Sequence, residues 1–390
     1  MWIAKKVLRI IVNRIYTIRL FIIGSVLYRD LLIIKAIPKY SATNRLFFGK
    51  QIPVLISEPE CMGKSTSLLL QAKLGVHAPV RKYCDTFDDV IILGGGSPIA
   101  LNSDRKPLWN AIAYQFFNFD RSYTPIEWFI RQNFNSKWVE QEYVIFLCST
   151  WSSNYYHWLF DNLARLQVLN FLDDEIKARV KILVGSKLST FQSSSLAALG
   201  FKNIEYIEDK NYRIKHLLVP NFPLEQQGYD LDQILWLKNK ILKNTEFDTT
   251  NTELIDLKIL ILRKPSAGRA FLNQDQILEA LIPIGFKTFY LEELSFEQQV
   301  RLFKQAKYVV AAHGAGLANI IFADRAIVIE IFAEQVFPCY FQLAKTLGLK
   351  YGFHLCDADR RASSKNQDMY VDIASLLKLI QSLGDAQEGS

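Results

Sequence analysis

In the second half of the chain, short apolar runs alternate with amphipathic stretches. Short apolar runs rich in β-branched residues are typical of strands that are buried on both faces of a sheet. The pattern predicts strands at residues 257–262, 287–290, 308–312 and 326–331, and helices at 276–282, 296–306 and 317–322. Strands and helices that alternate in this way form a doubly wound, parallel sheet.

The first half of the chain shows a similar alternation. It predicts strands at residues 90–93, 143–147, 181–184, 204–207 and 217–219, and helices at 155–166, 190–199 and 231–244. A polar stretch without periodicity, residues 245–256, separates the halves and suits an interdomain hinge. We therefore expect an α/β protein with two Rossmann-like domains, residues 46–245 and 246–368. Residues 369–390 hold a final amphipathic helix, for which a return to the N-terminal domain is left open.

Residues 1–45 form a basic segment in which single cations separate apolar pairs. The longest uncharged run, residues 20–28, is far shorter than the roughly 20 residues that span a bilayer. No small-residue cleavage site follows it, so we expect neither a membrane span nor a signal peptide. Residues 1–37 instead predict an amphipathic helix on the anionic inner face of the cell membrane, which would make the protein cytoplasmic and peripheral. A helix packed on the body or on a partner subunit is the alternative.

The distribution of charge and the spacing of the cysteines argue against two classes of protein, nucleic-acid-binding and zinc-binding proteins. Residues 1–50 carry ten Lys/Arg and one Asp, whereas the remainder carries 36 Lys/Arg and 38 Asp/Glu. The net charge of +7 therefore arises at the N-terminus, which argues against a nucleic-acid-binding protein. The cysteines are five in number and lack CxxC spacing, which favours a reducing compartment and offers no zinc site.

Residues 306–334 contain the clearest candidate for a binding site. A predicted strand ends at His313-Gly314-Ala315-Gly316, and a predicted helix follows. A glycine loop before a helix N-terminus binds anions, because backbone amides point outward and no Cβ blocks a phosphate. Glu330 closes the next strand, where a carboxylate can bond ribose hydroxyls. Such junctions are also ordinary structural features of α/β folds.

The predicted helix at 155–166 carries the candidate acid–base groups. His157, Asp161 and Arg165 are spaced four residues apart and would share one helical face, and Asn154 is a candidate N-cap. A carboxylate one turn from an imidazole can orient it, and either group can serve as a general base. A capping network in which Arg165 pairs with Asp161 is the structural alternative.

A cluster of cations follows the predicted strand at 257–262. Arg263, Lys264 and Arg269 surround a Pro/Gly loop at the end of this strand. Arginine offers a planar fork that suits phosphate oxygens, although such cations also occur in solvated turns. Two Asp-x-Asp triplets, at 230–232 and 357–359, do not directly follow a buried strand, so we expect no metal site at either.

Three blocks of this sequence resemble glycosyltransferase family 61, of the type found in bacterial capsular polysaccharide biosynthesis. The first block runs from Asn154 through His157-Trp158 and Asp161 to Arg165-Leu166. The second is a strand that ends on Arg263 and is followed by Arg269 and Asn273. The third runs from His313 to Asn319, with Phe322 and Val328-Ile329-Glu330 after it.

The resemblance implies an inverting, metal-independent enzyme of the GT-B type, in which two Rossmann-like domains face each other across a cleft. It implies transfer of a sugar from a nucleotide-diphosphate donor, UDP-linked in our expectation, to a hydroxyl. Asp161 or His157 would be the base, and Glu330 would bind the ribose. The remaining roles are donor binding by Arg263, Arg269, His313, Gly314, Ala315, Gly316 and Asn319, and support by Asn154, Arg165 and Asn273.

The expected partners are a nucleotide-sugar donor and a glycan or glycolipid acceptor in surface or capsular polysaccharide synthesis. No nucleic acid and no cofactor are expected, and the oligomeric state is left open. Residues 109–138 are rich in aromatic side chains, which could stack on sugar rings or belong to the core. Two alternatives remain at this point, a non-catalytic subunit that binds nucleotide-sugars or glycans and a GT-B-like sugar-nucleotide epimerase.

Overall fold

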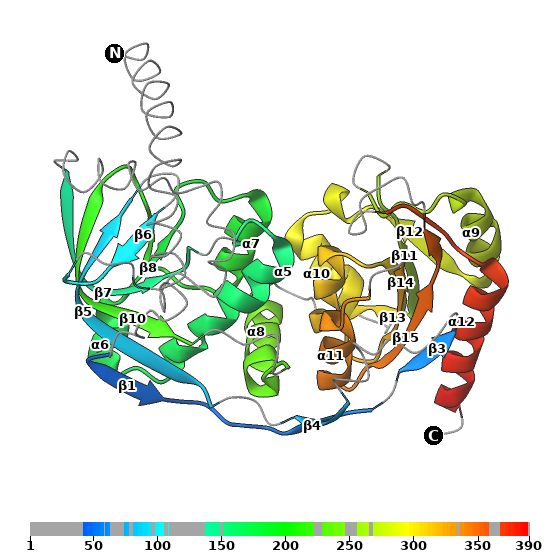
Figure 1. Ribbon diagram of the computed structural model, residues 1–390, viewed down its shortest axis with the longest axis horizontal. Helices are drawn as coiled ribbons and strands as arrows, with labels where there is room; N and C mark the ends of the chain where they lie inside the picture. Colours follow the sequence, from blue (N-terminus) through cyan, green and yellow to red (C-terminus); the bar gives the residue numbers. More distant parts are fainter. Residues whose placement is uncertain are drawn as a thin grey trace, which may run out of the picture. The chain divides into compact units, whose positions relative to one another are not determined.

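The protein is a mixed α/β protein that contains two large sheets, seen in a computed structural model (Figure 1). The structure describes residues 42–57, 59–62, 74–77, 81–94, 98–104, 108, 137–148, 151–221, 228–245, 256–264, 268–333, 336–358 and 367–388. The expected membrane helix at 1–37, most of the proposed hinge and most of the aromatic stretch at 109–138 lie outside these residues. Within the described residues, no helix is long and apolar enough to cross a membrane.

The second sheet is parallel throughout, as the alternation predicts. Its strand order is β12 (Phe286–Phe289), β11 (Leu257–Ile261), β13 (Ala306–Ala312), β14 (Ile327–Phe332), β15 (Lys350–Leu355) and β3 (Glu60–Met62). Successive side chains of a strand point to opposite faces. Val309 packs in one core with helices α10 (Phe296–Lys304) and α11 (Cys339–Thr346), and Val310 packs in another with α9 (Gln274–Leu281) and α12 (Ile373–Glu388). Figure 1 shows these two helix pairs on opposite sides of the sheet.

The edge strand β3 comes from the N-terminal part of the chain. Its residues pair in parallel with β15, although the sequence placed them in the domain at 46–245. Helix α12 contacts β3, β14 and β15. The second sheet therefore recruits one strand from early in the sequence, and the C-terminal helix packs on this sheet. The domain boundaries themselves stay predictions.

The first sheet is mixed. Its order is β1 (Asn44–Phe47), β5 (Tyr83–Leu93), β10 (Asn211–Pro220), β7 (Trp138–Phe146), β8 (Lys181–Val184) and β9 (Ile204–Tyr206), with β6 (Ile99–Leu101) paired to β5. The strands from β10 to β9 are parallel, as expected for a Rossmann-like unit. Strand β5 is antiparallel to each of its neighbours and is longer than the strand that we predicted at 90–93. Two short sheets complete the described strands: β2 (Val54–Ile56) with β4 (Gly75–His77), and β16 (Asp357–Ala358) with β17 (Met369–Tyr370).

Helices α6 (Asp174–Arg179), α7 (Thr190–Ala198) and α8 (Leu231–Asn244) accompany the first sheet. The Asp230 side chain caps α8 by accepting a hydrogen bond from the backbone N–H of Gln233. Apolar side chains of α7 and α8 belong to the same buried cluster as those of α10 and of the short helix Ala315–Phe322. One core therefore joins elements that accompany both sheets.

Candidate active site

The chain after β7 carries the first candidate pair, His157 and Asp161. Asn154 begins the helix, because its Oδ1 accepts hydrogen bonds from the N–H groups of Tyr156 and His157, at 3.0 and 3.4 Å. The Nδ1 atom of His157 lies 2.6 Å from Oδ2 of Asp161, and both side chains are partly exposed. A carboxylate at Nδ1 fixes the imidazole with its proton on that nitrogen and leaves Nε2 able to accept another. The pair can therefore act as a base.

The helix that holds this pair changes its winding. It is α-helical at α5 (Tyr155–His157), π-helical at Trp158–Asn162 and 3₁₀-helical at Leu163–Asn170, whereas we expected one α-helix. His157 and Asp161 still meet across the π-helical turn, but the change of winding beyond it no longer keeps Arg165 on the same face. Single π turns of this kind are frequent at functional sites.

Arg165 consequently turns into the protein. Its side chain is only 2% exposed, and Nε donates a hydrogen bond to the carbonyl of Pro220 at the end of β10. Burial lowers the pKa of Arg165 to about 10, against the opposing effect of nearby acidic groups that include Asp161. Arg165 thus anchors the helix to the end of β10.

The glycine loop follows β13 and leads into the helix Ala315–Phe322, which is 3₁₀-helical rather than α-helical. A Cβ on Gly314 would lie 2.3 Å from a guanidinium nitrogen of Arg263, and one on Gly316 would lie 2.6 Å from Cδ1 of Leu291. A side chain at either position would therefore displace the end of Arg263 or of Leu291. Ala315, between them, is half-buried. The absent Cβ of Gly314 brings Arg263 against the loop where we expected the phosphate itself.

Arg263 and Arg269 lie together beside this loop. Nη1 of Arg269 donates to the carbonyl of His313 at 2.7 Å, and its backbone has a positive φ of 58°. Burial lowers the pKa of both arginines, and the charge of Arg269 further lowers the pKa of Arg263. An anion that binds between two cations in a half-buried site reduces the repulsion between them. The geometry therefore suits a diphosphate.

A second histidine–acid pair lies at the end of the same sheet. Nδ1 of His313 is 2.5 Å from Oε1 of Glu330, and Oε2 of Glu330 accepts from the hydroxyl of Tyr351 at 2.5 Å. Glu330 is 0% exposed and both of its oxygens are bonded, so the ribose contact that we expected has no exposed oxygen to use. Glu330 instead orients His313, whose ring stacks on Phe337 with centroids 4.7 Å apart.

The sequence did not indicate that His313 and Glu330 pair with each other, nor that aromatic residues lie beside them. The parallel register of β13 and β14 places Ala311 opposite Glu330, which brings His313 to the same strand end. The ring of Tyr340, from α11, lies 5.4 Å from that of His313 and 5.7 Å from that of Tyr156. Tyr156 in turn contacts its neighbour His157. The Tyr156–Tyr340 contact therefore lies between the two histidine–acid pairs.

Two predicted site residues are buried and bonded to protein atoms. Asn319 accepts from the hydroxyl of Tyr155 at 2.5 Å, and its Nδ2 donates to Gln299 and to the carbonyl of Gly316. It thus links the start of the His157 helix to the glycine loop. Asn273 bonds both the N–H and the carbonyl of Val371. Both side chains position backbone segments in this structure.

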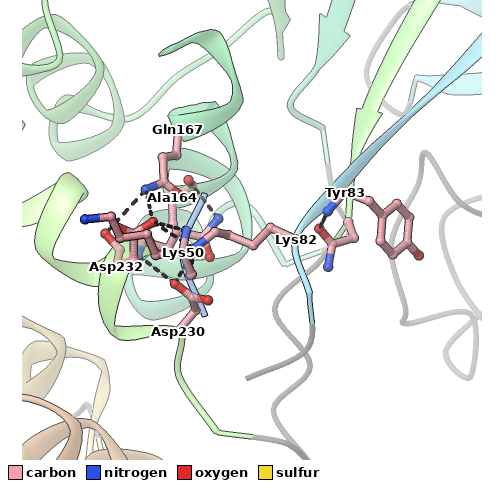
Figure 2. Close-up of polar contacts among 9 residues, drawn as sticks. Lys50, Lys82, Tyr83, Ala164, Gln167, Asp230 and Asp232 are labelled. Carbon is pink, nitrogen blue, oxygen red and sulfur yellow. Dashed lines mark hydrogen bonds and ion pairs between the residues drawn. The ribbon is translucent and has the colours of Figure 1, made fainter. Parts of the chain in front are cut away.

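The triplet Asp230-Leu231-Asp232 already binds a cation of the protein itself. Figure 2 shows the Lys82 side chain directed at both carboxylates, with Nζ 2.6 Å from Oδ1 of Asp230 and 3.0 Å from Oδ2 of Asp232. Gln167 also donates to Asp232. The triplet thereby ties Lys82, the residue before β5, to α8. Across the part of the chain that the structure describes, no three His, Cys, Asp or Glu residues lie together as a metal site would need.

Comparison with known proteins finds a family model and several relatives that match parts of this chain. The family model described as Glycosyltransferase 61 matches residues 155–329. The EGF domain-specific O-linked N-acetylglucosamine transferase of Gallus gallus is 29% identical over 101 residues, which are 24% of this chain and 19% of that relative. The protein of the same name from Mus musculus is 30% identical over 101 residues, with the same coverage. This chain therefore matches 19% of the length of these relatives.

The matched segment contains both candidate bases, both arginines and the glycine loop. It begins at the helix of His157 and ends one residue before Glu330. Residues 155–329 thus match glycosyltransferase family 61, and this match supports glycosyltransferase activity for the protein.

Proposed function

We propose that the protein transfers a sugar from a nucleotide-diphosphate donor to an acceptor hydroxyl, with inversion at the anomeric carbon. The observation that carries this proposal is the arrangement of the site. A potential base, His157 with Asp161, lies on one side of the Tyr156–Tyr340 contact, and His313 lies on the other side, with Arg269 bonded to its carbonyl. Glycosyl transfer needs a base for the acceptor and positive charge for the leaving diphosphate.

In the proposed reaction, the acceptor oxygen attacks the anomeric carbon as its proton passes to the His157–Asp161 pair. The bond between the anomeric carbon and the diphosphate oxygen breaks, and the diphosphate leaves with an additional negative charge. Arg263, Arg269 and His313 stabilise that charge, and Glu330 holds the His313 ring in place. A single displacement inverts the anomeric carbon. In this proposal the protein's own cations supply the charge, and no metal is required.

The two sheets support a GT-B arrangement as part of the proposal. The mixed sheet would belong to the acceptor domain at 46–245, and the parallel sheet, apart from β3, to the donor domain at 246–368. In sheets of this kind, ligands bind at the carboxyl ends of the parallel strands. In this chain the candidate site residues follow the carboxyl ends of β7, β11 and β13. A UDP-sugar is the donor that we propose, and UDP-N-acetylglucosamine is the first to test because the relatives are named as N-acetylglucosamine transferases.

A thermal-shift screen against UDP-, GDP-, CMP- and dTDP-sugars tests the proposal. We expect one nucleotide class to raise the melting temperature, because a ligand at 100 times its Kd stabilises the folded state by about 2.7 kcal/mol. Consumption of the same donor, measured as release of the nucleoside diphosphate, distinguishes an enzyme from a binding subunit. A protein that no nucleotide-sugar stabilises and that consumes none would contradict the proposed function.

We further propose that residues 1–37 hold the enzyme on the inner face of the cell membrane, where surface or capsular polysaccharide would be assembled. Each basic residue near an anionic surface contributes about 1 kcal/mol to binding. Deleting residues 1–37 should therefore release the protein from anionic vesicles in a sedimentation assay, and high salt should release the intact chain. Binding that survives both changes would instead favour a helix packed on the body or on a partner.

A further inference from the structure

Trp151 lies beside the candidate base and exposes its ring. Its ring centroid is 5.9 Å from that of His157, with 33° between the ring planes. The residue is 39% exposed. Isolated exposed aromatic residues are common on protein surfaces and need no special explanation. What distinguishes Trp151 is its direct contact with the imidazole that we propose as a base.

The backbone around Trp151 is fixed by hydrogen bonds. The carbonyl of Trp151 accepts from the N–H of Asn154 at 2.8 Å, which closes a turn just before the helix of His157. The carbonyl of Ser152 accepts from the buried side chain of Gln192 at 2.8 Å. Asn154 also caps the helix. The same short segment therefore positions both the indole ring and the base.

The position of the base restricts where the acceptor can lie. A general base must be within hydrogen-bond reach of the proton that it removes, about 2.6–3.2 Å between heavy atoms. The acceptor hydroxyl must therefore lie next to the His157–Asp161 pair. The group that carries this hydroxyl then lies within a few ångströms of the exposed indole, because the two rings are in contact.

We infer that Trp151 is an acceptor-binding residue and that the acceptor hydroxyl belongs to a sugar ring. This inference rests on the proposed function. The C–H face of a pyranose is an apolar surface large enough to cover one ring of an indole, and its hydroxyls lie at the rim. A sugar stacked on Trp151 would thus direct a rim hydroxyl toward His157. A serine or threonine hydroxyl of a protein is attached to one small carbon group, which would leave most of the indole uncovered.

The test compares Trp151→Ala, Trp151→Phe and a control, Tyr206→Ala. Tyr206 is a similarly exposed aromatic residue, 49% exposed, on β9. The acceptor probes are a panel of methyl pyranosides and a serine-containing EGF-type peptide, used with the donor that stabilises the full-length protein. Initial rates are measured at varied donor and varied acceptor, and the melting temperature of each variant shows whether it folds.

We expect Trp151→Ala to raise the KM for the methyl pyranoside about tenfold, with the KM for the donor unchanged. Trp151→Phe should recover most of the loss, because an aromatic face is restored, and Tyr206→Ala should behave as wild type. An unchanged acceptor KM in folded Trp151→Ala would overturn the inference and leave the proposed function standing. So would transfer to the peptide with none to any pyranoside. A protein that neither binds nor consumes a nucleotide-sugar would overturn the proposed function, and this inference with it.

Discussion

Asp161→Asn and His157→Ala should each lower turnover by about 10²–10⁴-fold while leaving donor affinity nearly unchanged. The reason is the 2.6 Å contact between Nδ1 of His157 and Oδ2 of Asp161, which makes the two residues one unit. Asn at position 161 keeps the shape of the carboxylate but removes its negative charge and its basicity. Transfer rates at saturating donor, with donor affinity from calorimetry, measure the effect.

The double variant provides the control for this prediction. When two residues act as a unit, replacing both lowers turnover little more than replacing one. The double variant Asp161→Asn with His157→Ala should therefore be about as slow as the slower single variant. If Asp161 were the base alone, His157→Ala would cost much less than Asp161→Asn. If His157 were the base alone, Asp161→Asn would cost much less than His157→Ala. Full activity in both single variants would show that this helix is purely structural.

Arg263→Ala and Arg269→Ala should each weaken donor binding roughly ten- to hundredfold, since a hydrogen bond to a charged group contributes roughly 1.5–3 kcal/mol. Both guanidinium groups are half-buried beside the glycine loop, where burial and mutual repulsion lower the pKa of Arg263. An anion bound there relieves that repulsion. Calorimetric titration with the nucleoside diphosphate measures the loss in each variant.

Lys264→Ala is the matched control for the arginine variants. Lys264 follows Arg263 directly, is exposed and pairs with Glu293, so its removal should leave nucleotide affinity unchanged. Arg269 also donates to the carbonyl of His313, and its loss could loosen the loop. The melting temperature of each unliganded variant separates that effect from binding. Unchanged affinity in both arginine variants would remove them from the site.

Those elements of the fold could be predicted whose structure depends on a local sequence pattern alone. The apolar runs gave β8, β11, β13 and β14 within two residues, because strands buried on both faces have a strong sequence signal. The antiparallel direction of β5 and the recruitment of β3 depend on pairing between distant segments, which composition does not encode. Lys82 and Asp230 likewise meet across 148 positions of sequence.

Only the contacts between residues close in sequence could be predicted for the site. The contact between His157 and Asp161 follows from their spacing, which also survives in a π-helical turn. Arg165 left the expected face because the helix changes its winding after His157. Glu330 lies within β14, two residues before its end rather than at the end that we expected, and its partner His313 is set by the register of β13 and β14. Neither Tyr340 nor Trp151 belongs to a motif that marks it as a site residue.

The edge strand β3 has a practical consequence for dividing this protein into pieces. Glu60 to Met62 cover the outer edge of β15, and α12 packs against both strands. A fragment that begins at residue 246 would contain every donor-binding candidate yet lack this cover. Its β15 edge would offer unpaired N–H and C=O groups to another chain, which is a common route to aggregation. A soluble donor-binding fragment therefore needs residues 59–62 supplied by fusion or by a circularly permuted chain.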